Sequence, residues 1–188
     1  MRFNNHSDLE GLHAFLSASK SHWLGYDDEK MIRTLKTRQA AARGTELHEI
    51  AARLIRLGLK QARTKQTFNM YVNDALGYRM KPEQVLFYSV NCFGTADAIS
   101  YRDGYLRIHD LKTGIGKTTF TQLEVYAALF CLEYGIRPGD LDDKIELRIY
   151  QNDKFVVHFP EIDRIAHIMD RIVHSDNLIN QKRAEEAA

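Results

Sequence analysis

Apolar residues at helical spacing dominate the first third of the chain. A capping pattern at Ser7 predicts a short helix over 7–16. A longer helix is predicted over 27–42, and Gly44-Thr45 is expected to interrupt it before another helix covers 46–59. That last helix should bury an apolar stripe of Leu47, Ile50, Ala51, Leu54 and Ile55.

The middle of the chain changes to the period-two alternation that is typical of strands. Three strands are predicted there: Val85–Cys92, Thr95–Arg102 and Tyr105–Lys112. Asp103-Gly104 separates the last two and is typical of a two-residue hairpin loop. The glycines over 113–117 predict a loop, and a helix is predicted over 118–134, where Gly135 ends it.

The C-terminal quarter predicts a second hairpin followed by a helix. Strands are predicted at 145–151 and 155–159, the helix at 162–179, and a frayed tail at 182–188. This order of elements predicts an α/β fold, an α+β sandwich with a central mixed β-sheet flanked by helices. We expect a single domain over 1–188, made of a helical N-terminal part (1–43), a core (44–134) and a C-terminal hairpin and helix (135–188).

Composition limits the function classes without selecting one. Of the 188 residues, 44% are hydrophobic and 27% are charged, which is typical of a globular protein. The net charge of +1 gives no overall attraction to nucleic acid, but 19–65 holds eleven basic and five acidic residues. This local excess can attract a phosphate backbone, or it can be the solvated faces of two helices.

Cysteine and hydropathy patterns favour a protein of the cytoplasm. Cys92 and Cys131 are the only cysteines and lie far apart in the sequence, which argues against a zinc or iron–sulfur site built on thiolates. We expect no signal peptide, because the first residues are polar, and no membrane span, because no apolar run is long enough.

The predicted hairpin loop at Asp103-Gly104 brings two acidic residues together. Counting back along both strands places Asp97 opposite Asp110, and Lys112 shares the face of Asp110. That face should also carry four core side chains: Ile99, Tyr101, Leu106 and Ile108. Opposed buried carboxylates are unfavourable unless a cation binds both, so we expect Mg²⁺ or Mn²⁺ there, with the Leu111 carbonyl as a further ligand. The alternative is a surface hairpin with an Asp–Lys ion pair.

Three more residues are candidates for the same site. His48 can complete a metal shell, although a lone histidine beside an apolar stripe is more often a hydrogen-bonded core residue. Gln122 and Tyr126 lie four residues apart on a predicted helix and therefore face the same way. The short loop before this helix should return it towards Lys112, so both side chains can reach the lysine or a phosphate. Ordinary helix packing is the alternative for this pair.

Taken together, four motifs resemble the PD-(D/E)xK nuclease superfamily, and specifically its RecB/Cas4-like exonuclease branch. They are Gly44-Thr45-Glu46-Leu47-His48, Gly94-Thr95-Ala96-Asp97, His109-Asp110-Leu111-Lys112-Thr113-Gly114 and Gln122-Leu123-Glu124-Val125-Tyr126. The matched region is 44–132, and the chain is similar to small phage-type members of the branch. It lacks the four cysteines of the members that hold an iron–sulfur cluster. The resemblance implies a restriction-endonuclease-like core.

The resemblance also implies a role for each matched residue. The Mg²⁺ or Mn²⁺ ligands would be His48, Asp97, Asp110 and the Leu111 carbonyl. Lys112 would be the catalytic lysine, and Gln122 and Tyr126 would orient this lysine and the DNA strand.

We therefore expect a divalent-metal-dependent deoxyribonuclease, with exonuclease action favoured over the alternative of endonuclease action, that acts in DNA recombination, repair or phage replication. Its expected partners are single- or double-stranded DNA and a recombination or replication protein, with no membrane. Its expected location is the cytoplasm, which is that of the bacterial host if the protein is phage-encoded. One alternative is a catalytically inactive nucleic-acid-binding module of nuclease fold that assists recombination or packaging. Another is a structural or adaptor protein without a nucleic-acid role.

Overall fold

The computed structural model describes residues 14–16 and 18–186, so most of the helix predicted over 7–16 lies outside the described residues. The chain divides into two compact units, Met1–Arg43 and Gly44–Ala188. This boundary falls where the sequence separates the helical N-terminal part from the core. All the candidate site residues belong to the second unit.

One long helix, α1 (Asp28–Leu57), replaces the two helices predicted between residues 27 and 59. It follows a short 3-10 helix, η2 (Ala18–Gly25), and Asp27 caps its first turn by accepting a hydrogen bond from the Lys30 N–H at 2.7 Å. The expected interruption at Gly44-Thr45 is wrong. A glycine inside a helix costs only about 1 kcal/mol. A β-carbon at Gly44 would lie 2.7 Å from Thr113 Oγ1, so close packing explains why glycine occupies this helical position.

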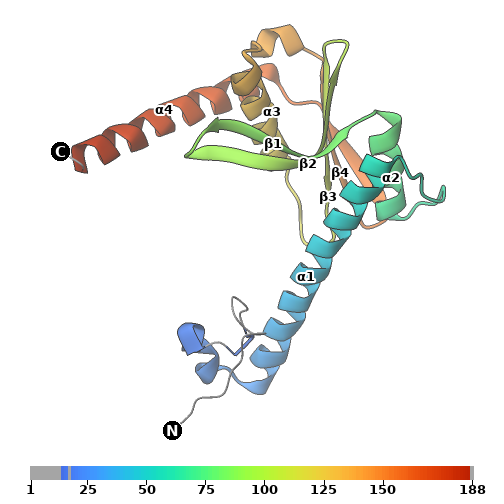
Figure 1. Cartoon of the computed structure of the whole chain (residues 1–188), viewed down its shortest axis with the longest axis vertical. Coiled ribbons are helices and arrows are strands. Elements are labelled where there is room, and N and C mark those ends of the chain that lie inside the picture. Colours follow the sequence, from blue (N-terminus) through green and yellow to red (C-terminus); the bar gives the residue numbers. More distant parts are fainter. Residues whose placement is uncertain (1–13, 17, 187–188) are drawn as a thin grey trace. The chain divides into compact units, whose positions relative to one another are not determined.

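Within the described residues, five strands form one mixed sheet in the order β1-β2-β3-β4-β5 (Figure 1). Their bounds are Lys81–Ser89 (β1), Cys92–Arg102 (β2), Tyr105–Leu111 (β3), Ile145–Gln151 (β4) and Lys154–His158 (β5). β3 and β4 run parallel, and the other neighbouring pairs are antiparallel. A parallel pair needs a crossover connection, which α3 provides here. The predicted mixed sheet flanked by helices is confirmed.

The predicted two-residue loop between β2 and β3 is also confirmed. Asp103 and Gly104 have φ angles of 52° and 76°, the left-handed region that such a tight hairpin requires. Arg102 pairs with Tyr105, and the same register continues to Ala98 opposite His109. One further step of this register leads to Asp97 and Asp110.

Helices cover both faces of the sheet (Figure 1). On one face lie α3 (Thr121–Tyr134) and α4 (Ile162–Glu186), which pack on a core that includes Leu106, Ile108 and Leu147. A short 3-10 helix, η3 (Pro138–Leu141), precedes β4. On the other face α2 (Thr67–Gly77) and the end of α1 surround Ala98, Leu111 and Tyr150.

Helix α4 is longer than predicted. It continues to Glu186, so the expected frayed tail at 182–188 is wrong over its described part. Gln181 and Lys182 both donate hydrogen bonds to Glu185, at 3.3 Å each. Contacts between side chains three and four residues apart stabilise a helix, and here they support its last turns.

Three side chains expected in the core are exposed. Tyr101 is 44% exposed, although Ile99 and Ile108 on the same predicted face are buried. The Tyr101 ring packs on the Phe130 ring near the end of β2, and the two ring centroids lie 5.1 Å apart. Leu47 and Ile50 are 38% and 42% exposed, because α1 packs on the rest of the fold through Ala51, Ala52 and Ile55 instead.

A partly buried charge network anchors α2 to β4. Arg148 donates to Asp74 Oδ2 at 3.1 Å and to the Tyr78 hydroxyl at 2.9 Å, and thereby holds the end of α2. Within β4 it also donates to Glu146 Oε1 at 2.7 Å. Buried charges are tolerated where each one is paired, as here, so this network fixes the position of α2 against the sheet.

Candidate metal centre

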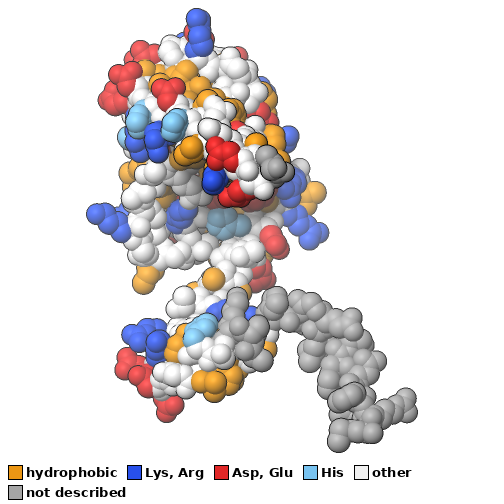
Figure 2. Space-filling view, turned by 90° about the vertical axis from the view of Figure 1, so that its left-hand side faces the viewer, with side chains coloured by type: hydrophobic (Ala, Val, Ile, Leu, Met, Phe, Trp, Pro, Cys, Tyr) orange, Lys and Arg blue, Asp and Glu red, His pale blue; other side chains and the backbone are white. Residues whose placement is uncertain are grey.

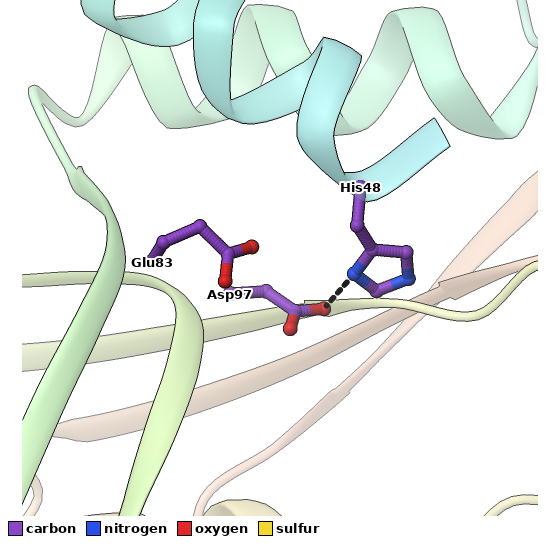
Figure 3. A group of neighbouring side chains, drawn as sticks. All are labelled: His48, Glu83 and Asp97. Carbon is purple, nitrogen blue, oxygen red and sulfur yellow. Dashed lines mark ion pairs between the residues drawn. The ribbon is translucent and has the colours of Figure 1, made fainter. Parts of the chain in front are cut away.

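Three potential metal-binding side chains converge from three different elements. His48 comes from α1, Glu83 from β1 and Asp97 from β2, and one ligand atom of each lies within 4.8 Å of the others (Figure 3). His48 Nδ1 lies 3.3 Å from Asp97 Oδ2. The fold therefore brings together His48 and Asp97, which the sequence assigned to one site.

Asp97 is held in place by the end of β3. Its Oδ2 atom accepts a hydrogen bond from the backbone N–H of Leu111 at 2.9 Å. β2 and β3 stop pairing just before this point, after Ala98 and His109. The carboxylate thus replaces a backbone acceptor where the two strands separate. The contribution of Leu111 to the site is its amide; a role for its carbonyl as a metal ligand stays a prediction.

Glu83 is a cluster member that the sequence did not indicate. It lies in β1 between Pro82 and Gln84, and the pairing of these two neighbours places it opposite Asp97. Its φ of 51° is left-handed, which is rare for a glutamate inside a strand. Figure 3 shows its carboxylate on the same side of the strands as His48 and Asp97. The dipeptide Pro82-Glu83 is a local signal that could have indicated this residue, because proline within a sheet is typical of an edge strand.

A second set of polar side chains runs from Asp110 to Tyr126. Lys112 Nζ donates to Asp110 Oδ1 at 3.0 Å and to Gln122 Oε1 at 2.9 Å. Gln122 Nε2 donates in turn to the Tyr126 hydroxyl at 3.1 Å. Four residues predicted for the site therefore form one continuous hydrogen-bonded chain. The amide of Gln122 is held at both ends, which fixes the direction in which its oxygen faces the lysine.

Asp110 carries the most buried carboxylate of the site. It is 3% exposed, and within the described residues its Oδ2 atom has no hydrogen-bond partner. Burial, followed by the negative charge of Asp97, raises the pKa of Asp110. Asp110 lies beside the His48–Glu83–Asp97 cluster, but it is not one of the side chains whose ligand atoms all lie within 4.8 Å of one another. A buried acceptor without a partner is costly, and a cation is one group that would satisfy it.

The pKa values of His48 and Glu83 shift in the direction that a negative, partly buried environment dictates. The hydrogen bond to Asp97 raises the pKa of His48. Burial, followed by the charge of Asp97, raises the pKa of Glu83. Both groups therefore hold protons more tightly than in water, as expected beside a neighbouring carboxylate. Carboxylate oxygens suit both Mn²⁺ and Mg²⁺, and an imidazole nitrogen suits Mn²⁺ better than Mg²⁺, so these donors fit Mn²⁺ best among the expected cations.

No protein family, curated protein or solved structure matches this chain. The resemblance to PD-(D/E)xK nucleases therefore stays a prediction that rests on the four motifs. Within the described residues, none of the helices is both long enough and apolar enough to cross a membrane.

The packing of Tyr126 against β2 allows a test of the site's architecture. A β-carbon at Gly94 would lie 2.9 Å from Tyr126 Cε1, which is closer than real β-carbons approach other atoms. Because Gln122 also holds the tyrosine, the ring cannot move away without straining that hydrogen bond. We expect Gly94→Ala to lower the free energy of unfolding by about 1–3 kcal/mol, as measured by urea denaturation.

Two further variants make this test specific to the contact. Tyr126→Leu removes the ring, so Gly94→Ala should cost clearly less stability when combined with it. Gly139→Ala adds a β-carbon where no atom lies within 4 Å, and its effect should stay within about 0.5 kcal/mol. An equal loss from Gly94→Ala with and without the tyrosine ring would contradict the proposed contact.

Proposed function

We propose that this chain is a divalent-metal-dependent hydrolase that cleaves phosphodiester bonds in DNA. The observation that carries the proposal is that Lys112, held by Asp110 and Gln122, lies beside the His48–Glu83–Asp97 cluster. The charges of Asp97 and His48 both affect the pKa of Asp110. The pair of Asp110 and Lys112 is therefore close enough to the His48–Glu83–Asp97 cluster for their charges to interact. One phosphate of the substrate would then contact both a cation held by the carboxylates and the ammonium group of Lys112.

Lys112 is proposed to stabilise the reacting phosphate. Its ammonium group has three N–H donors, and Asp110 and Gln122 accept two of them. The third can donate to a phosphate oxygen, on which negative charge grows as water attacks the phosphorus. Tyr126 acts on this step indirectly, because its hydroxyl accepts a hydrogen bond from Gln122 and fixes the amide that holds the lysine.

His48, Glu83 and Asp97 are proposed to hold the cation, with Asp110 beside them. A divalent cation bound there supplies Lewis-acid stabilisation of negative charge on the phosphate. The three side chains come from a helix and two strands, so the site is preorganised by rigid elements. In the reaction a water oxygen bonds to phosphorus and gives up one proton, the bond from phosphorus to one sugar oxygen breaks, and that oxygen takes up a proton.

DNA is proposed as the substrate because of the resemblance and because of the basic residues near the carboxylates. Arg53 and Arg56 lie exposed on the part of α1 that belongs to the same unit as the site. The positive charge of Arg56 is close enough to Glu83 to lower the pKa of this carboxyl group, against the rise that burial causes. A polyanion approaching several carboxylates needs such positive charge to offset repulsion.

The experiment that tests this function compares linear duplex, circular duplex and single-stranded DNA in the presence of Mn²⁺, Mg²⁺ or EDTA. We expect degradation of linear DNA with Mn²⁺ and none with EDTA. Degradation of linear but not circular DNA would identify an end-dependent exonuclease. DNA binding without cleavage under any cation would contradict the proposal and favour an inactive binding module. The absence of both binding and cleavage would favour an adaptor protein.

A further inference from the structure

Beyond the metal centre, β1 and β2 continue as a two-stranded hairpin (Figure 1). β2 pairs with β3 from Ala98 onward, so among the described strands 92–97 pairs with β1 alone. One face of this hairpin packs towards α3: Leu86 is buried, and Gly94 faces Tyr126. The opposite face carries three exposed apolar side chains, which we call the hairpin platform: Val85 (48% exposed), Phe87 (46%) and Phe93 (62%).

The hairpin platform lies in line with the metal-binding carboxylates. Side chains alternate along a strand, so Phe93 and Asp97, four positions apart on β2, lie on one face with the exposed Thr95 between them. Four strand residues span about 13 Å, roughly the length of four stacked nucleotides. A DNA strand with a phosphate at the metal centre can therefore reach the platform with its next few bases.

The two aromatic rings of the platform act together. Phe87 and Phe93 are direct partners across the two strands. Their ring centroids lie 6.3 Å apart and the ring planes are tilted by 32°, so the rings form one broad aromatic surface. On the side of the molecule that Figure 2 shows, exposed hydrophobic side chains lie among charged ones. Such a mixture suits a ligand that carries flat apolar groups on a charged backbone.

Strand addition by a second protein is a weaker explanation for this exposed hairpin, although β1 is at the edge of the sheet. The backbone N–H of Phe87 already donates to Glu133 Oε2 at 2.8 Å. Pro82 lacks an N–H, Glu83 has a left-handed φ, and the register with β2 shifts between Phe87 and Ser89. These are features that protect an edge strand from pairing with another chain.

We propose that the hairpin platform stacks the bases of single-stranded DNA that enters the metal centre. This inference rests on the proposed function and makes single-stranded DNA the preferred substrate. Aromatic side chains stack on bases of any sequence, because every base has a flat face. In a duplex these faces are covered by neighbouring base pairs, so a stacking surface selects unpaired strands. Phe93 is the principal contact, since it is the most exposed of the three.

The test measures binding of the full chain to a fluorescent oligothymidylate and to a duplex of equal length, by fluorescence anisotropy in EDTA. We expect Phe93→Ala and Phe87→Ala each to weaken single-strand binding about 10-fold and to leave duplex binding unchanged. Phe93→Tyr keeps an aromatic ring and should retain the wild-type affinity. Phe159→Ala is the matched control, because Phe159 is 57% exposed and follows β5 at the opposite edge of the sheet.

Failure of this inference can be told apart from failure of the proposed function. Hydrolysis of bis(p-nitrophenyl) phosphate with Mn²⁺ needs the metal centre but not the platform, so Phe93→Ala should hydrolyse it at the wild-type rate. Equal losses of single-strand and duplex binding, or no loss at all, would overturn the stacking role even if hydrolysis is present. Concentration-dependent self-association of the wild type that Phe93→Ala removes would instead assign the platform to a second copy of the chain. No hydrolysis of the small diester by any variant would count against the metal centre itself.

Discussion

Replacement of Asp110 by asparagine is expected to abolish DNA cleavage while leaving the folded protein at least as stable as the wild type in EDTA. The carboxylate is buried, and its folded-state pKa is raised above the usual value, so its negative charge opposes folding at neutral pH. Asparagine removes that charge, and its side-chain oxygen can still accept the hydrogen bond from Lys112. Without the negative charge of Asp110, however, the site binds the divalent cation more weakly, and the hydrogen bond that positions Lys112 is weaker.

The expected loss of cleavage is at least about 10³-fold in the initial rate on linear DNA with Mn²⁺, the scale seen when a group that stabilises the transition state is removed. Thermal unfolding in EDTA provides the stability measurement. A functional carboxylate that costs stability is typical of active sites. A stable Asp110→Asn protein that cleaves at the wild-type rate would rule out the proposed role of Asp110.

Asp176 offers a matched control with the opposite sign. It is also a largely buried aspartate, but hydrogen bonds from Ser89 and then Asn91 hold its pKa below the usual value. Its charge therefore favours folding at neutral pH, and the contribution is lost as the pH falls through the lowered pKa. Asp176→Asn should lower the unfolding temperature and retain cleavage, which is the reverse of the result expected for Asp110→Asn.

Addition of Mn²⁺ is expected to raise the unfolding temperature of the wild type by about 5–10 °C. A ligand present at 100 times its dissociation constant stabilises the folded state by about 2.7 kcal/mol, and each kcal/mol shifts the midpoint of a chain of this size by about 2–4 °C. In the cluster, the carboxylates of Glu83 and Asp97 lie within 4.8 Å of one another and of the His48 ring, so the folded protein should bind the cation well. Differential scanning fluorimetry with increasing Mn²⁺ measures the shift.

Single variants then assign the ligands. Glu83→Gln and His48→Gln should each remove more than half of the Mn²⁺-dependent shift, because the first removes a negative charge from the cluster and the second removes its imidazole nitrogen. Asp103→Asn removes an acid from the exposed hairpin loop and should leave the shift intact. If Glu83→Gln shows the full shift and His48→Gln does not, the cation binds without Glu83. Metal binding would then not explain the left-handed backbone at Glu83.

Much of the fold followed from local pattern. The Asp103-Gly104 loop, the strand at Ile145–Gln151 and the end of α3 at Gly135 were predictable because each depends on nearest neighbours. The single α1 helix was not, because the glycine that reads as a breaker is required by the approach of Thr113, which is remote in the sequence. The exposure of Leu47 and Tyr101 also depends on where other helices and strands end, and the periodicity of the sequence does not show this.

The candidate site divides in the same way. Asp97, Asp110 and Lys112 were placed together by counting from one hairpin loop, and Gln122 and Tyr126 by helical spacing, since backbone geometry fixes both periods. Glu83 required the tertiary structure. Its position depends on the register of an edge strand and on a left-handed residue within it, and neither leaves a periodic trace in the sequence. The sequence by itself thus determined which side chains share a face, while the packing of α1 and β1 decided which of them meet.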